Sequence, residues 1–131
     1  MVADTSALVA FLLDEPEADA IRDAMAGARR RLISAVTLFE ARTVLWARFG
    51  TAMLDGLDEL VGSWAPEIRA FDAEQSAAAF AAYRQFGKGT GHPAQLNLCD
   101  CAAYALATSL DVPLLFKGGD FGRTDVRPAL S

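Results

Sequence analysis

The sequence predicts an α/β fold in which a mostly parallel central sheet is flanked by helices on both faces. Short apolar runs typical of buried strands alternate along the chain with longer segments of helical periodicity. Strands that are separated by helices favour a parallel sheet with both faces covered. The 131 residues, of which 53% are hydrophobic and 22% charged, suit one compact unit. We therefore expect a single domain over residues 1–131.

Caps and prolines mark the elements expected in the first half of the chain. Ser6 has the side chain of an N-cap ahead of an apolar run, and Pro16 suits the first turn of a following helix. Thr37 and Glu40 have capping-box spacing before a helix that Gly50 would end. The expected elements are strands over 2–4 and 31–34, and helices over 7–13, 17–26, 41–49 and 52–64.

The second half of the chain continues the alternation. Asp72 with Gln75, and Asn97 with Asp100, have the three-residue spacing of helix N-terminal pairs. Glycines and proline indicate a long loop between those two helices. The expected elements are a strand over 68–71, a helix to Phe86, a loop over 88–95, a helix over 98–110, a strand over 112–116 and a short edge strand over 124–126.

Composition excludes several classes of protein. The formal net charge of −5 argues against a nonspecific nucleic-acid binder with a basic patch. Stretches without charge fall short of the ~20 residues that a bilayer span requires, and the N-terminus lacks a basic signal-peptide region. We therefore expect a cytoplasmic protein with no membrane contact. A structural zinc site needs about four sulfur or imidazole ligands. This sequence offers only Cys99, Cys101 and His92, which are too few.

Four acidic residues map to one edge of the predicted sheet, at the carboxyl ends of its strands. Asp4 ends the first strand, Glu40 and Asp100 lie early in helices, and Asp120 follows the fourth strand. Functional groups gather at this edge in such folds. Clustered carboxylates repel one another, and a hard divalent cation such as Mg²⁺ or Mn²⁺ relieves that repulsion. A bound cation can activate water against a phosphodiester.

Each of these acidic residues also has a plain structural explanation. Asp4 and Asp120 can end a strand or form a turn. Glu40 and Asp100 can complete capping boxes and interact favourably with a helix dipole. From the residues alone, a capping role and a site role for Glu40 and Asp100 remain open.

Four segments of the sequence occur in the order and spacing of one protein family. The chain opens with MVADTSALVA, has LFEA around Glu40, has LNLCDC followed by YALA around Asp100, and has LLFKGGDF around Asp120. Nearly end to end, these segments resemble the PIN-domain ribonucleases, and more narrowly the VapC toxins of bacterial toxin–antitoxin systems. Cys99 departs from the pattern, because many relatives carry glycine there.

The resemblance implies a metal-dependent endoribonuclease toxin with Mg²⁺ or Mn²⁺ as cofactor, which hydrolyses RNA phosphodiester bonds through metal-activated water. It also implies a homodimer and neutralisation by a cognate VapB-type antitoxin. The toxin would contact DNA only through that antitoxin. Residue by residue, it places catalytic, metal-binding carboxylates at Asp4, Glu40, Asp100 and Asp120. It places a polar catalytic residue that positions water or phosphate at Thr5 or Ser6.

Two other functions remain open at this stage: a PIN nuclease of RNA processing that is not a toxin, and a PIN domain that binds RNA or protein without cleaving. The four carboxylates speak against the second, since a pure binding module has no need to gather negative charge where a phosphate must lie. Other notable residues have mainly structural explanations. They are the His92 loop, the Arg29–Arg31 run, Asp125, and the tryptophans at 46 and 64, which suit a core or a dimer interface.

Overall fold

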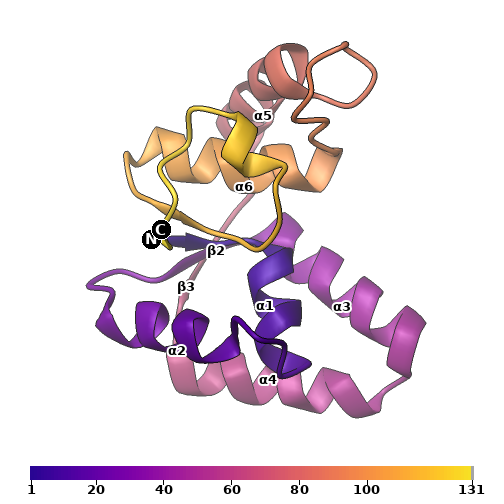
Figure 1. Ribbon diagram of the computed structural model, residues 1–131, viewed down its shortest axis with the longest axis vertical. Helices are drawn as coiled ribbons and strands as arrows, with labels where there is room; N and C mark the ends of the chain where they lie inside the picture. Colours follow the sequence, from indigo (N-terminus) through magenta and orange to yellow (C-terminus); the bar gives the residue numbers. More distant parts are fainter. Residues whose placement is uncertain (131) are drawn as a thin grey trace.

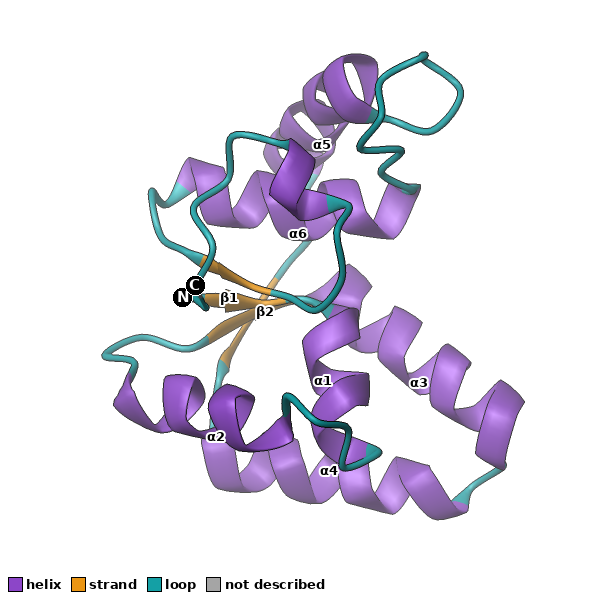
Figure 2. Cartoon of the chain, viewed as in Figure 1, coloured by secondary structure: helices purple, strands orange, loops and turns teal. Residues whose placement is uncertain are grey.

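A four-stranded parallel sheet forms the centre of the computed structural model, which describes residues 1–130. The strands are β1 (Val2–Ala3), β2 (Leu32–Ser34), β3 (Glu67–Arg69) and β4 (Leu114–Leu115), in the order β3-β2-β1-β4. Val2 pairs with Leu32 on one side and with Leu114 on the other, and every pairing between these strands is parallel. Figure 2 shows the short strands between two layers of helix. The predicted α/β fold is confirmed.

Helices cover both faces of the sheet (Figure 1). One layer contains α1 (Thr5–Leu12), α2 (Ala18–Gly27), α3 (Ala35–Phe49) and α4 (Ala52–Trp64). The other contains α5 (Ala73–Phe86) and α6 (Leu98–Ser109), which pack against each other. No helix in residues 1–130 has the length and apolar character needed to cross a membrane.

The strands alternate their side chains between the two layers, as the period of two requires. Val2, Leu32 and Leu114 belong to the core beneath α5 and α6. Their successors, Ala3, Ile33 and Leu115, belong to the core of the other layer, and all six are fully buried. Because both faces are covered, the strands are apolar throughout, and this explains why they appear in the sequence as short continuous apolar runs.

Two predicted helix starts are wrong, and both errors lie at strand–helix junctions. Asp4, not Ser6, caps α1, because its carboxylate accepts a hydrogen bond from the backbone of Ser6. Ser34 caps α3, so this helix begins at Ala35 and the predicted Thr37–Glu40 capping box does not exist. A polar residue that directly ends a strand is already in place to cap the next helix. The predicted Asp72–Gln75 pair and the Asn97–Asp100 capping box are confirmed.

The end of the chain differs from the prediction. No edge strand forms over 124–126. Instead, a short 3-10 helix, η1 (Phe121–Arg123), is followed by a single bridge between Leu114 and Pro128. The Thr124 hydroxyl donates to the Phe121 carbonyl and holds the turn there. The strand at 114–115 is shorter than predicted because β1 offers only two residues for pairing. The strand at 67–69 is offset from the predicted one because it pairs with residues 32–34 of β2.

The arginine run at 29–31 serves the fold. The Arg31 guanidinium donates to the carbonyls of Met25, Ala26 and Trp64, near the C-terminal ends of α2 and α4. Arg30 forms a forked pair with Glu67 on β3. Arg31 thus satisfies carbonyls that helix ends leave without partners.

Candidate active site

The four predicted site carboxylates lie together at the carboxyl edge of the sheet. Asp4 follows β1, Asp100 lies in the first turn of α6, Glu40 in the second turn of α3, and Asp120 just after β4. Their charges act on one another. The Glu40 charge raises the pKa of Asp4, and the charges of Asp4, Glu40 and Asp120 all raise the pKa of Asp100. We call these four side chains the carboxylate cluster.

Asp4 is the buried member of the cluster, with a relative exposure of 3%. Its Oδ2 atom accepts hydrogen bonds from the Ser6 backbone N–H at 2.9 Å and from Ser6 Oγ at 2.6 Å. Its Oδ1 atom is buried and has no hydrogen-bond partner. Burial raises the pKa of Asp4 to about 6 against the opposing effect of the Ser6 bonds. A buried carboxylate oxygen without a partner is rare and costly, which indicates a site for a ligand.

Two hydroxyls orient the carboxylates. Ser6 Oγ donates to Asp4 and accepts the backbone N–H of Lys117, 3.0 Å away in the loop after β4. Thr5 Oγ1 donates to the Glu40 carboxylate. Each predicted polar site residue therefore lies beside the cluster, with its hydroxyl bound to a carboxylate. Lys117, which sequence reasoning did not single out, connects β4 to this arrangement, while its ammonium pairs with Glu15 and Glu17.

Asp100 combines the two roles that its position in the sequence left open. Its Oδ2 atom accepts the Asn97 backbone N–H at 3.0 Å, and its own N–H donates to Asn97 Oδ1 at 2.8 Å. Burial is the main cause that raises its pKa to about 7, and the charges of the other three carboxylates add to it. Asp100 thus caps α6 and also belongs to the cluster.

Glu40 and Asp120 form the more open side of the cluster. Glu40 is half-buried beside Thr5, and Asp120 is exposed and makes no side-chain cap bond to η1. The chain reaches Asp120 through Gly118, whose φ of +102° is a conformation that side-chain-bearing residues rarely adopt. This turn brings the Asp120 charge close enough to act on Asp100.

The cluster does not form a ready-made cage for a metal. Within residues 1–130, no three His, Cys, Asp or Glu side chains come close enough together to hold an ion between them. Mg²⁺ does not require such a cage, because it keeps several waters and usually binds through one or two carboxylates. The unpartnered Oδ1 atom of Asp4, beside Asp100, fits a hydrated ion of this kind.

Other residues noted in the sequence have structural partners away from the cluster. His92 Nδ1 accepts the Ala94 N–H, and its ring meets Phe86 edge-on. Trp64 packs against Phe11, whereas Trp46 is 60% exposed and is not part of the core. Asp125 accepts a hydrogen bond from the Tyr104 hydroxyl, in agreement with a structural role.

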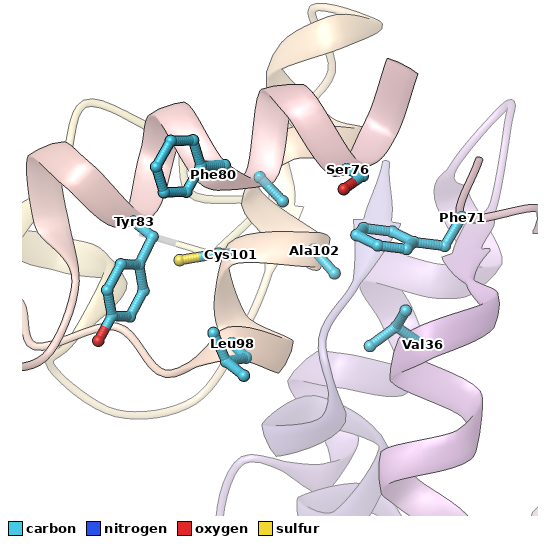
Figure 3. Close-up of a pocket in the computed structure, with 9 residues that line it drawn as sticks. Val36, Phe71, Ser76, Phe80, Tyr83, Leu98, Cys101 and Ala102 are labelled. Atoms are coloured by element: carbon cyan, nitrogen blue, oxygen red, sulfur yellow. The ribbon is translucent and has the colours of Figure 1, made fainter. Parts of the chain in front are cut away.

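An apolar groove of about 420 Å³ lies beside the start of α6. Figure 3 shows Phe80 and Tyr83 of α5 across from Leu98 of α6, with Phe71 and Val36 closing one end. Phe80 is 62% exposed and Leu98 75% exposed. The helical pattern gave no indication of this groove, because it forms only where α5, α6 and the start of α3 meet.

The match to known proteins covers nearly the whole chain. The PIN domain family model matches residues 1–127. Ribonuclease VapC28 of Mycobacterium tuberculosis is 44% identical over 130 residues, which cover 99% of this chain and 98% of the relative. The chain belongs to the VapC family of PIN-domain proteins. A second VapC relative, ribonuclease VapC30 of the same species, is 46% identical over 126 residues, or 96% of this chain and 95% of its own.

Solved structures agree on the VapC fold. The Mycobacterium tuberculosis toxin VapC20, which cleaves the Sarcin-Ricin loop, has a TM-score of 0.73 at 16% identity, with 97% of this chain and 98% of that chain covered. A toxin–antitoxin complex from Klebsiella pneumoniae has a TM-score of 0.66 at 17% identity, with 92% and 88% covered. At these identities the likeness concerns the fold alone.

Proposed function

We propose that this VapC protein is an endoribonuclease toxin that hydrolyses RNA phosphodiester bonds with Mg²⁺ or Mn²⁺ at the carboxylate cluster. One observation carries the metal site: the buried Oδ1 atom of Asp4 lacks a partner, while burial and neighbouring carboxylate charges raise the pKa of Asp4 and Asp100. The relatives at 44% and 46% identity are named as ribonucleases, and this supports RNA as the substrate.

Asp4 and Asp100 would hold the cation, and Glu40 and Asp120 would complete or orient its water shell. When bound, such an ion lowers the pKa of a coordinated water and offsets charge on the phosphodiester. The protein's own contribution is positioning. Ser6 fixes Asp4 through two hydrogen bonds, so that only Oδ1 is free. Thr5 holds the Glu40 carboxylate in the same region.

The charge balance explains why an acidic protein can act on RNA. Four carboxylates at one edge, in a chain of net charge −5, repel a phosphodiester in the absence of metal. A divalent cation offsets part of this negative charge and gives the phosphate a positive ion to bind. A module that only bound RNA would gain from losing these carboxylates. Their retention therefore favours an enzyme over a binding domain.

Two protein partners follow from the same proposal. A cognate VapB-type antitoxin would neutralise the toxin and provide its only contact with DNA, as the toxin–antitoxin complex among the fold neighbours suggests. An antitoxin arginine could pair with the carboxylates in a forked geometry and so compete with metal. A homodimer would cover exposed apolar side chains such as Phe80 and Leu98. We place this activity in the cytoplasm.

Cleavage of total RNA by the purified protein, freed of antitoxin, tests the proposal. We expect cleavage with Mn²⁺ or Mg²⁺ and none in EDTA. Asp4→Asn and Asp100→Asn should abolish most of it, while Asp58→Asn, an exposed aspartate on α4, should cleave like the wild type. Undiminished cleavage in EDTA would contradict the metal mechanism.

Co-purification with the product of the neighbouring gene separates a toxin from a housekeeping nuclease. A toxin should emerge bound to a small partner and inactive, and should gain activity when the partner is removed. A protein that emerges alone and fully active would instead support a role in RNA processing.

A further inference from the structure

The loop between α5 and α6 carries positive charge at the same edge of the sheet as the carboxylate cluster. Residues 75–99 contain no Asp or Glu, although the chain has a net charge of −5, and they include Lys88 and His92. Figure 1 shows the loop projecting between the end of α5 and the start of α6. Asp100 lies in the first turn of α6, so the loop leads directly into the cluster.

A hydrogen bond joins this loop to the other side of the cluster. The Arg123 guanidinium of η1 donates to the Pro93 carbonyl at 3.0 Å, and Asp120 immediately precedes η1. The loop therefore connects the helix that carries Asp100 with the turn that carries Asp120. A guanidinium has five N–H donors, so the bond to Pro93 leaves others for a ligand.

A hollow of about 410 Å³ lies on the loop and is lined by loop residues alone. Lys88 is exposed there, and its ammonium pairs with no carboxylate within residues 1–130. Lys117, the other lysine of the chain, instead pairs with Glu15 and Glu17. The ammonium of Lys88 is thus free to attract an anion. The lining consists of Lys88, Gly89, Gly91, His92, Pro93 and Gln95.

Two further features of the hollow suit a phosphate. His92 Nδ1 accepts the Ala94 N–H at 3.0 Å, so Nε2 is the ring nitrogen left to donate. Gly89 and Gly91 have φ values of +90° and +89°, and nothing lies within 4 Å of the positions that Cβ atoms would take. Backbone without side chains lets a phosphate approach closely. The hollow therefore combines a cation, a ring donor and open backbone.

We propose that this hollow is a subsite for the RNA backbone, in which Lys88, His92 and Arg123 hold a phosphate next to the one that is cleaved. This inference rests on the proposed function, in which RNA is the substrate. The strand carries a phosphate on each side of the scissile one, and the carboxylates repel both. A metal at the cluster offsets charge at the scissile bond, whereas the neighbouring phosphates need cations of the protein.

A protein partner fits the hollow less well. The centre of a protein interface is formed mainly by buried apolar and aromatic side chains, and the hollow is lined by glycines and polar residues with a single proline. Exposed aromatic side chains such as Phe80 line the separate groove of Figure 3 instead. The chemistry of the hollow therefore favours a phosphate-bearing strand.

The salt dependence of RNA binding tests the inference. The probe is labelled single-stranded RNA of mixed sequence, added in EDTA to the full-length Asp4→Asn protein, where no cleavage is expected. In this background Lys88→Gln should weaken binding roughly tenfold at low salt. It should also reduce the slope of log affinity against log salt by about 0.7, the contribution of one phosphate contact on a single strand. Arg29→Gln removes an exposed arginine ahead of β2, at the opposite edge of the sheet, and should change neither quantity.

Cleavage kinetics with Mn²⁺ provide a second measurement. In the otherwise wild-type protein, Lys88→Gln should raise KM for RNA roughly tenfold and leave kcat within about twofold, because the contact is the same before and during cleavage. His92→Asn keeps an acceptor for the Ala94 N–H and removes the Nε2 donor. It should also raise KM, with an unchanged melting temperature.

The outcomes separate this inference from the function on which it rests. Unchanged affinity and slope in Lys88→Gln would overturn it, as would an absence of RNA binding by the Asp4→Asn parent. An equal loss in Arg29→Gln would overturn it too, because the effect would then reflect net charge alone. If Lys88→Gln weakens only the complex with the antitoxin, the loop is a protein contact and the inference fails. A Lys88-dependent slope in a protein that does not cleave RNA with Mn²⁺ would count against the proposed function alone.

Discussion

Replacing Asp4 with asparagine should stabilise the metal-free protein at neutral and alkaline pH. The carboxylate is 3% exposed and lies beside other carboxylates, so its charged form is disfavoured in the folded state. Asparagine keeps an oxygen that can accept both Ser6 hydrogen bonds and removes the charge. An N-cap residue is thereby replaced by another good N-cap residue.

The magnitude follows from the shift in pKa. Burial raises the Asp4 pKa from its ordinary value of 3.8 to about 6, and one pKa unit corresponds to 1.36 kcal/mol, which gives about 3 kcal/mol. The folded state holds this proton more tightly than the unfolded chain does. The free energy of unfolding therefore falls as pH rises from about 4 to 6, and the loss is complete above that. Asp4→Asn has no such loss.

Urea unfolding in EDTA at about pH 4 and about pH 8 measures this effect. Between the lower and the higher pH, the free energy of unfolding of Asp4→Asn should increase by about 3 kcal/mol relative to that of the wild type. The exposed Asp58→Asn control should follow the wild type. Comparing the two pH values cancels any constant cost of the asparagine amide. If the difference in free energy of unfolding between Asp4→Asn and the wild type is the same at both pH values, the burial of a charged Asp4 is refuted.

Three further changes test the roles of individual side chains. Ser6→Ala removes the hydroxyl between Asp4 and Lys117 and should weaken Mn²⁺ binding by roughly 10- to 100-fold in a metal titration; unchanged affinity would show that Ser6 does not position Asp4. Glu40→Gln keeps an acceptor for Thr5 and should lose most cleavage without lowering the metal-free melting temperature, and a fully active variant would remove Glu40 from the site. Arg31→Ala removes the guanidinium hydrogen bonds to three helix-end carbonyls, of which Met25 alone keeps a backbone partner, and should cost about 1–3 kcal/mol in urea unfolding with cleavage intact, whereas wild-type stability would contradict its capping role.

The sequence predicted the parts of the structure that local chemistry determines. The Asp72 and Asn97 caps were predicted correctly, because an N-cap needs only a short polar side chain and the backbone of the next turn. The convergence of Asp4 and Asp100 followed from topology, since parallel strands end at one edge. The resemblance to VapC toxins supplied the family, which the PIN domain match and the VapC relatives confirm.

Features that depend on packing could not be predicted. Thr37 and Glu40 have the spacing of a capping box, but Ser34 is already in place at the end of β2 and starts the helix earlier. The Glu40 charge acts on Asp100 only because α3 packs against α6. The apolar groove depends in the same way on three helices that are distant in sequence.

Cleavage of RNA in ¹⁸O-labelled water with Mn²⁺, followed by mass spectrometry of the product ends, tests most directly whether the cluster activates water. Attack by water places one ¹⁸O atom on the product phosphate at the moment of cleavage and forms no cyclic phosphate. We therefore expect singly labelled terminal phosphate from the wild type, and no product from Asp4→Asn or from the wild type in EDTA. An unlabelled 2′,3′-cyclic phosphate, formed equally well in EDTA, would contradict metal-activated water as the nucleophile.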